Sequence, residues 1–597
     1  MPLMRISFRI SSRIPSSLLA VSLSIAMAVP PGSPAHAATS DPRTPSTPGA
    51  PLPRLLDGLS SAPEIPDAIA PGVFGTYGGE RARLSGTPAS TPSLRRPLQT
   101  QQLPDLGDGS GGALTPQAER RLGERVMREV RRDPDYLDDW LVRDYLDTVA
   151  AKLSAAAAAQ FIGGERPDFD LFPMRDPQIN AFSLPGGFIG VNSGLVIMTR
   201  TESELASVLG HEMGHVLQRH IARMIGANEK SGYAALASML VGVLAGVLAR
   251  SGDLGSAIAL GGQAYLVDNQ LRFSRGAERE ADRVGFQLLA GAGYDPYGMP
   301  GFFERLDRST MGDAGVPEYV RTHPLTTDRI ADMDDRARRA PYRQPRQSAE
   351  YALVRARLRI LQPHTPSDIA AEVRRMRGEL DDRVAPNVAA NWYGIALGQM
   401  LLGNLDDADR ALAAARERFE TVQRDEGAVA AAMPNSSSAS NASNAPSTPS
   451  LDVLAAEIAR RAGRTVDAVR LAQRAQQRWP GSHAAIVVHL QALVAAKRFG
   501  EAQALAQRQA DADPRQPDWW AWLAQAAQGN GDAILRRRAQ AEKLALDGAW
   551  PSAIRQLREA RDDKAVSFYE QSIITARLHD FERRYKEEQD DKDDERG

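Results

Sequence analysis

Residues 201–224 read TESELASVLGHEMGHVLQRHIARM, and this stretch decides the fold of the first folded domain. Thr201 followed by Glu204 forms a capping box, which starts a helix. Apolar side chains then recur at helical spacing, at Leu205, Val208, Leu209, Val216 and Leu217. Residues four apart lie on one face of a helix, so His211 and His215 can direct their imidazoles at a single metal ion.

The residues from His211 to His215 form the pattern HExxH. Glu212 stands beside the first candidate ligand, where its carboxylate can reach a water on the metal without binding the metal itself. The alternative is a polar helix with two histidines on its surface. The chain has only nine histidines among 597 residues, and two of them flank Glu212 here. The pattern therefore predicts a metal site that residues elsewhere in the chain must complete.

A second part of this site is predicted at residues 273–285, FSRGAEREADRVG. A site with two histidines needs a third protein ligand and an open position for water. Glu278 is the candidate for the third ligand. Asp282, one turn further along the same helix face, is placed to accept a hydrogen bond from a ligand imidazole and to orient it. The alternative is a solvated helix face that also carries Arg279, Glu280 and Arg283.

The composition excludes several classes of protein and of metal site. The chain contains no cysteine, which excludes a lipoprotein signal, a disulfide framework and thiolate ligands. Any zinc must therefore be held by histidine and carboxylate. The 72 basic and 74 acidic residues nearly balance, so the net charge does not favour binding to nucleic acid.

The N-terminal segment has the three parts of a secretory signal peptide, which we predict at residues 1–37. Its basic part contains three arginines, its apolar part spans residues 18–29, and its cleavage site is Ala35-His36-Ala37. A membrane anchor, the alternative, requires about 20 apolar residues. Export without cysteines is typical of the periplasm of a Gram-negative cell. Residues 38–114 are rich in Pro, Ser, Gly and Thr and are predicted to be a disordered linker.

A folded domain is predicted at residues 115–345, with two amphipathic helices followed by three short strands. The strands are expected at residues 169–172, 179–183 and 187–191, and Pro185-Gly186-Gly187 supplies the turn between the last two.

The last of these strands is a candidate substrate edge. Its glycines would let another backbone approach closely, and a strand just before the metal helix can pair with an extended peptide. We therefore predict a substrate edge within residues 179–191, formed above all by Gly187, Phe188, Ile189, Gly190 and Val191. The alternative is a plain hairpin.

The segment at residues 231–249, SGYAALASMLVGVLAGVLA, has no charged residue. It is long enough to span a bilayer, but it is rich in Ala and Gly, and a span would separate the HExxH helix from Glu278. A buried helical hairpin, a mobile active-site lid and a peripheral membrane contact are therefore favoured, and a true membrane span is the further alternative.

The paired motifs His211-Glu212-x-x-His215 and Ser274-Arg275-x-x-Glu278-x-x-Ala281-Asp282 resemble those of the gluzincin metallopeptidases of the CAAX-prenyl-protease and HtpX group. The signal peptide and the helical C-terminal half are most similar to the BepA-type periplasmic members. The resemblance covers residues 115–345 closely and the remainder by architecture. It implies an α+β zincin domain, mainly α with a small β-sheet, in which His211, His215 and Glu278 bind one Zn²⁺ and Glu212 is the general base.

Residues 322–330, THPLTTDRI, resemble the His-Pro-x-x-x-x-Arg segment that follows the core in BepA-type proteins. There the histidine can occupy the open zinc position and keep the protease latent. From chemistry alone, His323 could be a fourth ligand, a catalytic donor to the transition state, or a loop histidine that stabilises a turn. His220 lies nine residues from His211, about 180° round a continuous helix, and should not be a ligand.

An all-α solenoid resembling tetratricopeptide (TPR) repeats is predicted at residues 346–583. Ala468, Leu471 and Pro480 recur 34 residues later as Ala502, Leu505 and Pro514, which is the period of that repeat. A glycine followed five residues later by alanine recurs at Gly403 and Ala408, Gly463 and Ala468, and Gly548 and Ala553. Residues 434–450 form a low-complexity insertion, and residues 584–597 are predicted to be a charged, disordered tail.

The resemblance implies a periplasmic zinc endopeptidase with chaperone-like activity in the assembly and quality control of outer-membrane β-barrel proteins. Its substrates would be unfolded or stalled outer-membrane proteins, and its repeats would dock the β-barrel assembly machinery. One alternative is a chaperone or assembly adaptor whose protease is normally latent, which is distinguished by whether His323 restrains activity. The other is a partner-binding protein with a structural zinc, whose site never opens.

Overall fold

The computed structural model describes residues 115–160, 168–226, 274–310, 316–341, 347–431 and 447–594. The predicted signal peptide at 1–37, the linker at 38–114 and the uncharged segment at 231–249 lie outside these ranges. Within them, no helix is both long enough and apolar enough to cross a membrane.

The first domain begins with α1 (Pro116–Val130) and α2 (Trp140–Ala159), and each helix has a side-chain cap. The Thr115 hydroxyl accepts a hydrogen bond from the Ala118 N–H, and Pro116 occupies the first turn of α1, where its missing N–H costs nothing. The Asp139 carboxylate accepts from the Val142 N–H over 3.1 Å at the start of α2.

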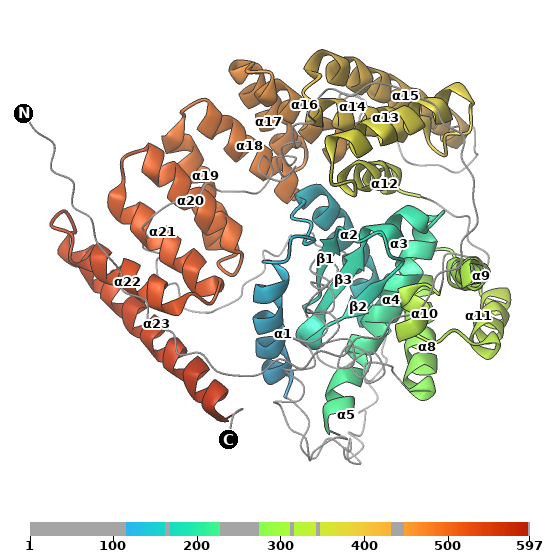
Figure 1. The fold of residues 1–597 in the computed structure, drawn as a ribbon, viewed down its shortest axis with the longest axis horizontal. Coiled ribbons are helices and arrows are strands. Elements are labelled where there is room, and N and C mark those ends of the chain that lie inside the picture. The colour runs from blue at the N-terminus through green and yellow to red at the C-terminus, as the bar shows by residue number, and fades with distance from the viewer. Residues whose placement is uncertain are drawn as a thin grey trace, which may run out of the picture. The chain divides into compact units, whose positions relative to one another are not determined.

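Three strands form one small sheet in the order β1-β3-β2. The strands are β1 (Asp170–Met174), β2 (Ala181–Ser183) and β3 (Phe188–Asn192). β1 pairs parallel with β3, and β2 pairs antiparallel with it. Figure 1 shows the three strands side by side between α1 and α4. The predicted turn is present as η2 (Pro185–Gly187), a 3₁₀ turn with a left-handed φ of +77° at Gly186 that only glycine adopts easily.

The position of β3 in the middle of the sheet contradicts the predicted substrate edge. Phe188, Ile189, Gly190 and Val191 all pair with β1, the last three also pair with β2, and Gly187 belongs to the 3₁₀ turn. A strand that is paired on both sides cannot receive a substrate strand. The glycine at 190 serves another purpose, because a Cβ there would lie 2.3 Å from the ring of Phe182. The free edge next to the metal helix is β2, the other half of the predicted 179–191 segment.

The remaining helices of the first domain are the metal helix α4 and the helices that pack around it and the sheet. They are α3 (Ser193–Met198), α4 (Glu202–Leu217), α5 (His220–Gly226), α8 (Arg275–Gly291), α9 (Gly298–Thr310), α10 (Glu318–Thr322) and α11 (Thr327–Arg339). In α4 every residue from 202 to 215 is buried, so this helix is the centre of the domain rather than a surface element.

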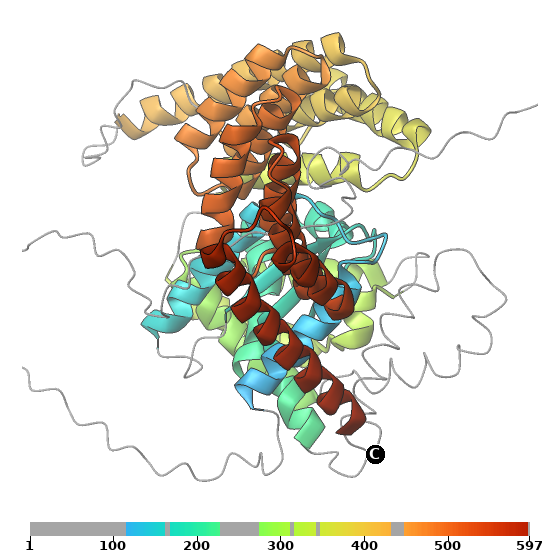
Figure 2. The same ribbon diagram turned by 90° about the vertical axis from the view of Figure 1, so that its left-hand side faces the viewer.

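Helices are the regular secondary structure of residues 347–594 in the parts that the structure describes, and successive helices pack side by side (Figure 1 and Figure 2). They are α12 (Ala349–Leu361), α13 (Pro366–Asp381), α14 (Val388–Leu401), α15 (Leu405–Ala431), α16 (Pro449–Arg461), α17 (Thr465–Arg478), α18 (His483–Ala495), α19 (Phe499–Ala512), α20 (Pro517–Gly529), α21 (Ala533–Leu546), α22 (Trp550–Arg561) and α23 (Phe568–Asp594). The predicted fold class, mainly α with a small sheet followed by an all-α region, is confirmed.

The repeated glycine and alanine positions have two different structural roles. Gly403, Gly463 and Gly548 each end a helix with a left-handed φ, of +82°, +71° and +75°. The alanines five residues later, Ala408, Ala468 and Ala553, are fully buried at the start of the following helix. The small side chains of these alanines let consecutive helices pack closely, whereas a Cβ at Gly403 or Gly463 would meet nothing within 4 Å.

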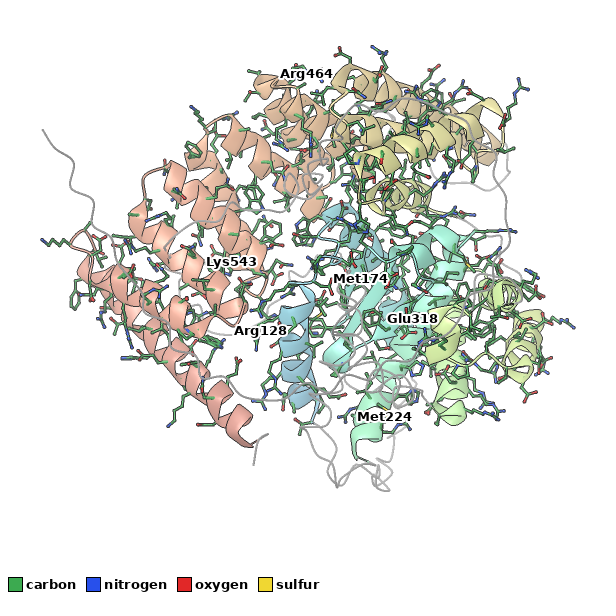
Figure 3. The ribbon with its side chains drawn as sticks, viewed as in Figure 1. Arg128, Met174, Met224, Glu318, Arg464 and Lys543 are labelled. Carbon is green, nitrogen blue, oxygen red and sulfur yellow. The ribbon has the colours of Figure 1, made fainter. Side chains whose placement is uncertain are left out.

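Two predicted boundaries of this region need correction. Helix α16 begins at Pro449 behind a Thr448 cap, so the last residues of the predicted insertion are helical. The predicted disorder of the tail is wrong for residues 584–594, which continue α23. The reason is Glu588, whose carboxylate accepts a hydrogen bond from the Trp550 indole over 2.7 Å and pairs with Arg128 of α1 over 3.2 Å. Figure 3 labels Arg128 on α1.

The helical region is joined to α2 by buried polar contacts. Arg357 of α12 is 2% exposed and binds the Asp139 carboxylate through its Nε and Nη2, over 2.9 and 2.6 Å. The Asp144 carboxylate of α2 caps α18, where it accepts from the Ser482 hydroxyl over 2.8 Å and pairs with His483 Nδ1 over 2.7 Å. The first domain and the helical region thus share α2 as a common support.

Candidate metal centre

Helices α4 and α8 meet backbone to backbone, and this close approach builds the site. A Cβ on Gly214 would lie 2.9 Å from the Ala281 carbonyl oxygen, and a Cβ on Gly285 would lie 2.8 Å from the His211 nitrogen. Larger residues would push the helices apart and move Glu278 away from the histidines. The sequence carried this signal, because small residues four apart face each other on the two helices.

Four side chains converge on one point: His211 and His215 from α4, Glu278 from α8 and His323 from the end of α10. One nitrogen or oxygen of each lies within 4.8 Å of the others. The two Nε2 atoms of His211 and His215 are 3.0 Å apart, and the Glu278 carboxylate oxygens lie 3.6 Å from each of them. All four residues are buried, which excludes the alternative of a solvated helix face.

Hydrogen bonds on the far side of each ring fix which nitrogen of each histidine faces the cluster. His211 Nδ1 lies 2.9 Å from Asp282 Oδ1, and His215 Nδ1 lies 2.9 Å from His220 Nδ1. If each Nδ1 carries the proton, both Nε2 lone pairs point at the same place. Burial also holds the pKa of His215 well below its ordinary value, so its ring is neutral. Two convergent lone pairs and a carboxylate fit a cation, and the absence of thiolate suits a histidine and carboxylate metal site.

Arg329 of α11 holds the two carboxylates of this site in place. Its Nε and Nη2 bind the Asp282 carboxylate over 2.6 and 2.8 Å, and its Nη1 lies 2.9 Å from Glu278 Oε2. Burial alone would raise the pKa of Asp282, but hydrogen bonds from Arg329 and His211 outweigh it and lower that pKa to about 2. Asp282 is therefore ionised and can orient His211, as its spacing suggested. Arg329 stood in the quoted segment, but no role was predicted for it.

A second chain of contacts orients His215 and was missed by the sequence analysis. Helix α4 ends at Leu217, Arg219 takes a left-handed φ of +50°, and α5 begins at His220. This turn brings His220 back against His215, whereas a continuous helix would carry it to the opposite side. His220 Nε2 in turn lies 3.1 Å from Glu280 Oε2, which Arg223 also binds over 2.8 Å. His220 is thus no member of the cluster, as predicted, but it contacts a member directly.

His323 lies inside the cluster rather than in an exposed turn. Its Nδ1 is 3.1 Å from Glu278 Oε1 and 3.4 Å from His211 Nε2, and its Nε2 is 3.5 Å from Glu212 Oε1. Its ring stacks on Tyr319, with centroids 4.8 Å apart. Burial alone would lower the pKa of His323, but the carboxylates of Glu278 and Glu212 outweigh it and raise that pKa. This position suits both roles near the metal that the sequence left open, which are a fourth ligand and a catalytic donor to the transition state.

The Glu212 carboxylate is fully buried beside the cluster, and Ser183 at the end of β2 donates to it. The Ser183 hydroxyl lies 2.6 Å from Glu212 Oε2, while Glu212 Oε1 makes no hydrogen bond within the described residues. The structure therefore brings together every predicted site residue except the β3 strand, whose residues pair within the sheet.

This set of donors on an HExxH helix is that of a metallopeptidase, the class that the sequence predicted, and a comparison with known families agrees. Residues 145–337 match the model described as Peptidase family M48, and the chain belongs to this family.

Individual relatives extend the similarity beyond the peptidase domain. The beta-barrel assembly-enhancing protease of Yersinia pestis is 29% identical over 484 residues, which are 81% of this chain and 92% of that protein. The protein of that name from Escherichia coli is 30% identical over 313 residues, 52% of this chain and 62% of that protein. The metalloprotease LoiP of Escherichia coli is 32% identical over 186 residues, 30% of this chain and 67% of that protein. The match thus covers less than two thirds of the Escherichia coli assembly-enhancing protease and nearly all of the Yersinia pestis protein of that name.

Proposed function

We propose that the chain is a zinc-dependent endopeptidase with Glu212 as its general base. The observation that carries this proposal is the convergence of His211, His215 and Glu278 beside a buried glutamate on the same HExxH helix. A zinc ion held by these three residues would act as a Lewis acid toward a water and the scissile carbonyl.

The protein side chains divide the remaining work. Glu212 Oε1, which makes no hydrogen bond within the described residues, would take the proton of the attacking water and return it to the leaving amine. Asp282 and His220 keep the ligand imidazoles oriented through their Nδ1 atoms. Arg329 balances the charge of the carboxylates that these steps require.

The substrate would lie extended along β2 rather than along β3. In the antiparallel pair, Leu184 N–H donates to Phe188 O and Asn192 N–H donates to Asn180 O, so even-numbered residues of β2 face β3. The backbone groups of Ala181 and Ser183 therefore face outward. No hydrogen bond from outside the sheet reaches them within the described residues. Ala181 is fully buried, whereas Ser183 is only partly buried, so the edge at Ser183 is the part that can pair with a peptide.

The relatives named beta-barrel assembly-enhancing proteases support a finer proposal about biological role. We infer that the protein is exported to the periplasm and cleaves unfolded or stalled outer-membrane β-barrel proteins. It would also assist their assembly in the manner of a chaperone. The TPR-like helices would dock the β-barrel assembly machinery, since such arrays present extended surfaces to protein partners.

A second candidate function is favoured by one observation, the place of His323 within the cluster. A histidine whose Nδ1 lies 3.4 Å from His211 Nε2 can fill the position that water needs. The protein would then be mainly an assembly adaptor whose protease is latent until His323 withdraws.

One experiment tests the proposed function. The mature protein, its Glu212→Gln variant and a chelator-treated sample are each incubated with an unfolded outer-membrane barrel protein, and zinc content is measured in parallel. We expect cleavage by the wild type only, with zinc retained in Glu212→Gln. Equal cleavage by the variant would contradict the mechanism, and bound zinc without any cleavage, also after His323→Ala, would favour a structural zinc.

A further inference from the structure

We propose that Ser183 is a positioning residue for the general base, so that the strand that receives the substrate also sets the orientation of Glu212. This inference rests on the proposed function. It concerns a residue that neither the motif nor the family match marks as part of the site.

The contact between the two side chains is short and buried at its acceptor end. The Ser183 hydroxyl lies 2.6 Å from Glu212 Oε2 and 3.3 Å from the Glu212 carbonyl oxygen. A hydroxyl has one proton to donate, and a bond to an ionised carboxylate is shorter and stronger than one to a neutral carbonyl. The distances therefore assign the proton to the carboxylate. No other hydrogen bond reaches this carboxylate in the described part of the chain.

This single bond makes the two oxygens of Glu212 unequal. Oε2 is committed to Ser183, whereas Oε1 faces the cluster, 3.5 Å from His323 Nε2. The last torsion of a glutamate is broad and roughly two-fold, so an unheld carboxylate would sample many orientations. Proton transfer requires the accepting oxygen at hydrogen-bond distance from the water in a defined direction. The hydrogen bond from Ser183, which is not a metal-binding residue, fixes that direction.

The location of Ser183 couples this role to the substrate. Its backbone faces the free edge of β2, as the ladder alternation requires, while its side chain reaches α4. The same edge is already closed two positions before Ala181, where the Tyr319 N–H donates to the Ile179 carbonyl oxygen over 3.2 Å. Ala181 is fully buried, so the accessible part of this edge is at Ser183. A peptide that pairs there would fix the backbone of Ser183, and through the hydroxyl it would fix Glu212.

A purely structural role of the Ser183 hydroxyl would have different kinetic consequences. The hydroxyl could serve only to tie β2 to α4, and its loss would then weaken the fold and alter substrate binding. A positioning role predicts a loss in kcat with KM and zinc content preserved, because the base is misplaced while the edge and the ligands remain. A threonine should restore the hydroxyl at this position, which is only partly buried.

The test compares Ser183→Ala, Ser183→Thr and Ser207→Ala with the wild type in the full mature protein. Ser207 is a matched control, because it is a buried serine of α4, one turn before His211, whose hydroxyl binds the Glu204 carbonyl oxygen over 2.7 Å and not the Glu212 carboxylate. We expect Ser183→Ala to lower kcat about 10-fold with KM within about twofold. Ser183→Thr should recover most of the kcat, and Ser207→Ala should match the wild type.

Three outcomes would overturn the proposal. They are a wild-type kcat in Ser183→Ala, a loss of the same size in Ser207→Ala, and a loss that Ser183→Thr does not restore. Absence of chelator-sensitive cleavage in the wild type, or cleavage by Glu212→Gln at the wild-type rate, would instead overturn the proposed function and the role of Ser183 with it. The Glu212→Gln sample therefore separates the two failures.

Discussion

The Nδ1 atoms of His215 and His220 lie 2.9 Å apart, so the histidine after the HExxH helix buttresses a ligand instead of pointing away from it. His215 can donate its Nδ1 proton to His220, whose Nε2 then donates to Glu280 Oε2 over 3.1 Å. Burial lowers the pKa of His220, which keeps its ring neutral and able to accept. The chain of contacts thus fixes the tautomer that leaves His215 Nε2 free for a metal.

Replacing His220 with alanine should lower the affinity for zinc about 10- to 100-fold, the range typical for residues that orient a ligand histidine. Competition with a chromophoric chelator measures this affinity directly. His489→Ala is the matched control, because His489 contacts Gln476 in the helical region and should leave zinc binding unchanged. Equal affinities in the two variants would mean that the contact does not support the ligand.

Arg329→Met should destabilise the first domain by about 3–5 kcal/mol, because it leaves two buried carboxylates without their cation. Arg329 is 3% exposed and contacts both Asp282 and Glu278. Urea unfolding in the presence of a chelator measures this loss without a contribution from zinc.

Arg336→Met in the same helix is the control for that measurement. Arg336 pairs with Asp332 one turn away on the surface, over 3.0 Å, and its loss should cost at most about 0.5 kcal/mol. If the two variants unfold at the same urea concentration, the buried network contributes no more than a surface pair.

The metal ligands could be found from the sequence because each half of the site is local. His211 and His215 are one turn apart on α4, as Glu278 and Asp282 are on α8, and the period of a helix fixes both pairs. Helix spacing alone does not show that the two pairs belong to one site. That step came from metal chemistry, because a two-histidine site needs a third ligand and, with no thiolate available, the ligand must be a carboxylate. The small residues of the two helices also indicated the close packing of Gly214 on Ala281, although no prediction used this pattern.

The errors arose where the structure depends on non-local contacts. The pattern of the strand containing Ile189 is the same at an edge or in the centre, and its position follows from the parallel pairing of Leu171 in β1. The contact of His220 with His215 was missed because a regular helix was extended past Leu217, whereas the chain turns at Arg219. That left-handed residue is held by Glu119 of α1, 3.0 Å away, a partner 100 residues earlier. Periodicity within one segment carries no information about either contact.

His323→Ala should raise proteolysis if the histidine keeps the protease latent. Removing the ring from its place 3.1 Å from Glu278 and 3.4 Å from His211 opens a position for water at the cluster. The rate of self-cleavage and of cleavage of an unfolded barrel protein are the readouts, with Glu212→Gln combined with His323→Ala as the inactive control. Unchanged or lower activity would count against a latch and in favour of a catalytic donor.

The joint between the first domain and the helical region should respond to pH through His483. Burial alone would lower the pKa of His483, but the hydrogen bond and charge of Asp144, 2.7 Å away, outweigh it and raise that pKa. Arg143 lowers the pKa of His483 and Asp147 raises it. Because the folded-state pKa lies above the ordinary value of about 6.5, the stabilisation is complete below that pH and is lost as pH rises through the folded-state pKa.

Thermal unfolding at pH 6 and at pH 8.5 should therefore show a larger drop in Tm for the wild type than for His483→Gln. The glutamine can keep a neutral hydrogen bond to Asp144 but gains no proton, so its Tm should depend less on pH. Because His483 is 40% exposed, water screens the pair and the difference should be small. Asp144→Asn should reduce the pH dependence in the same way, since it removes the charge that raises the pKa. A pH dependence that is identical in all three proteins would show that the joint is held by its other contacts, the stacking of Trp140 on Trp519 among them.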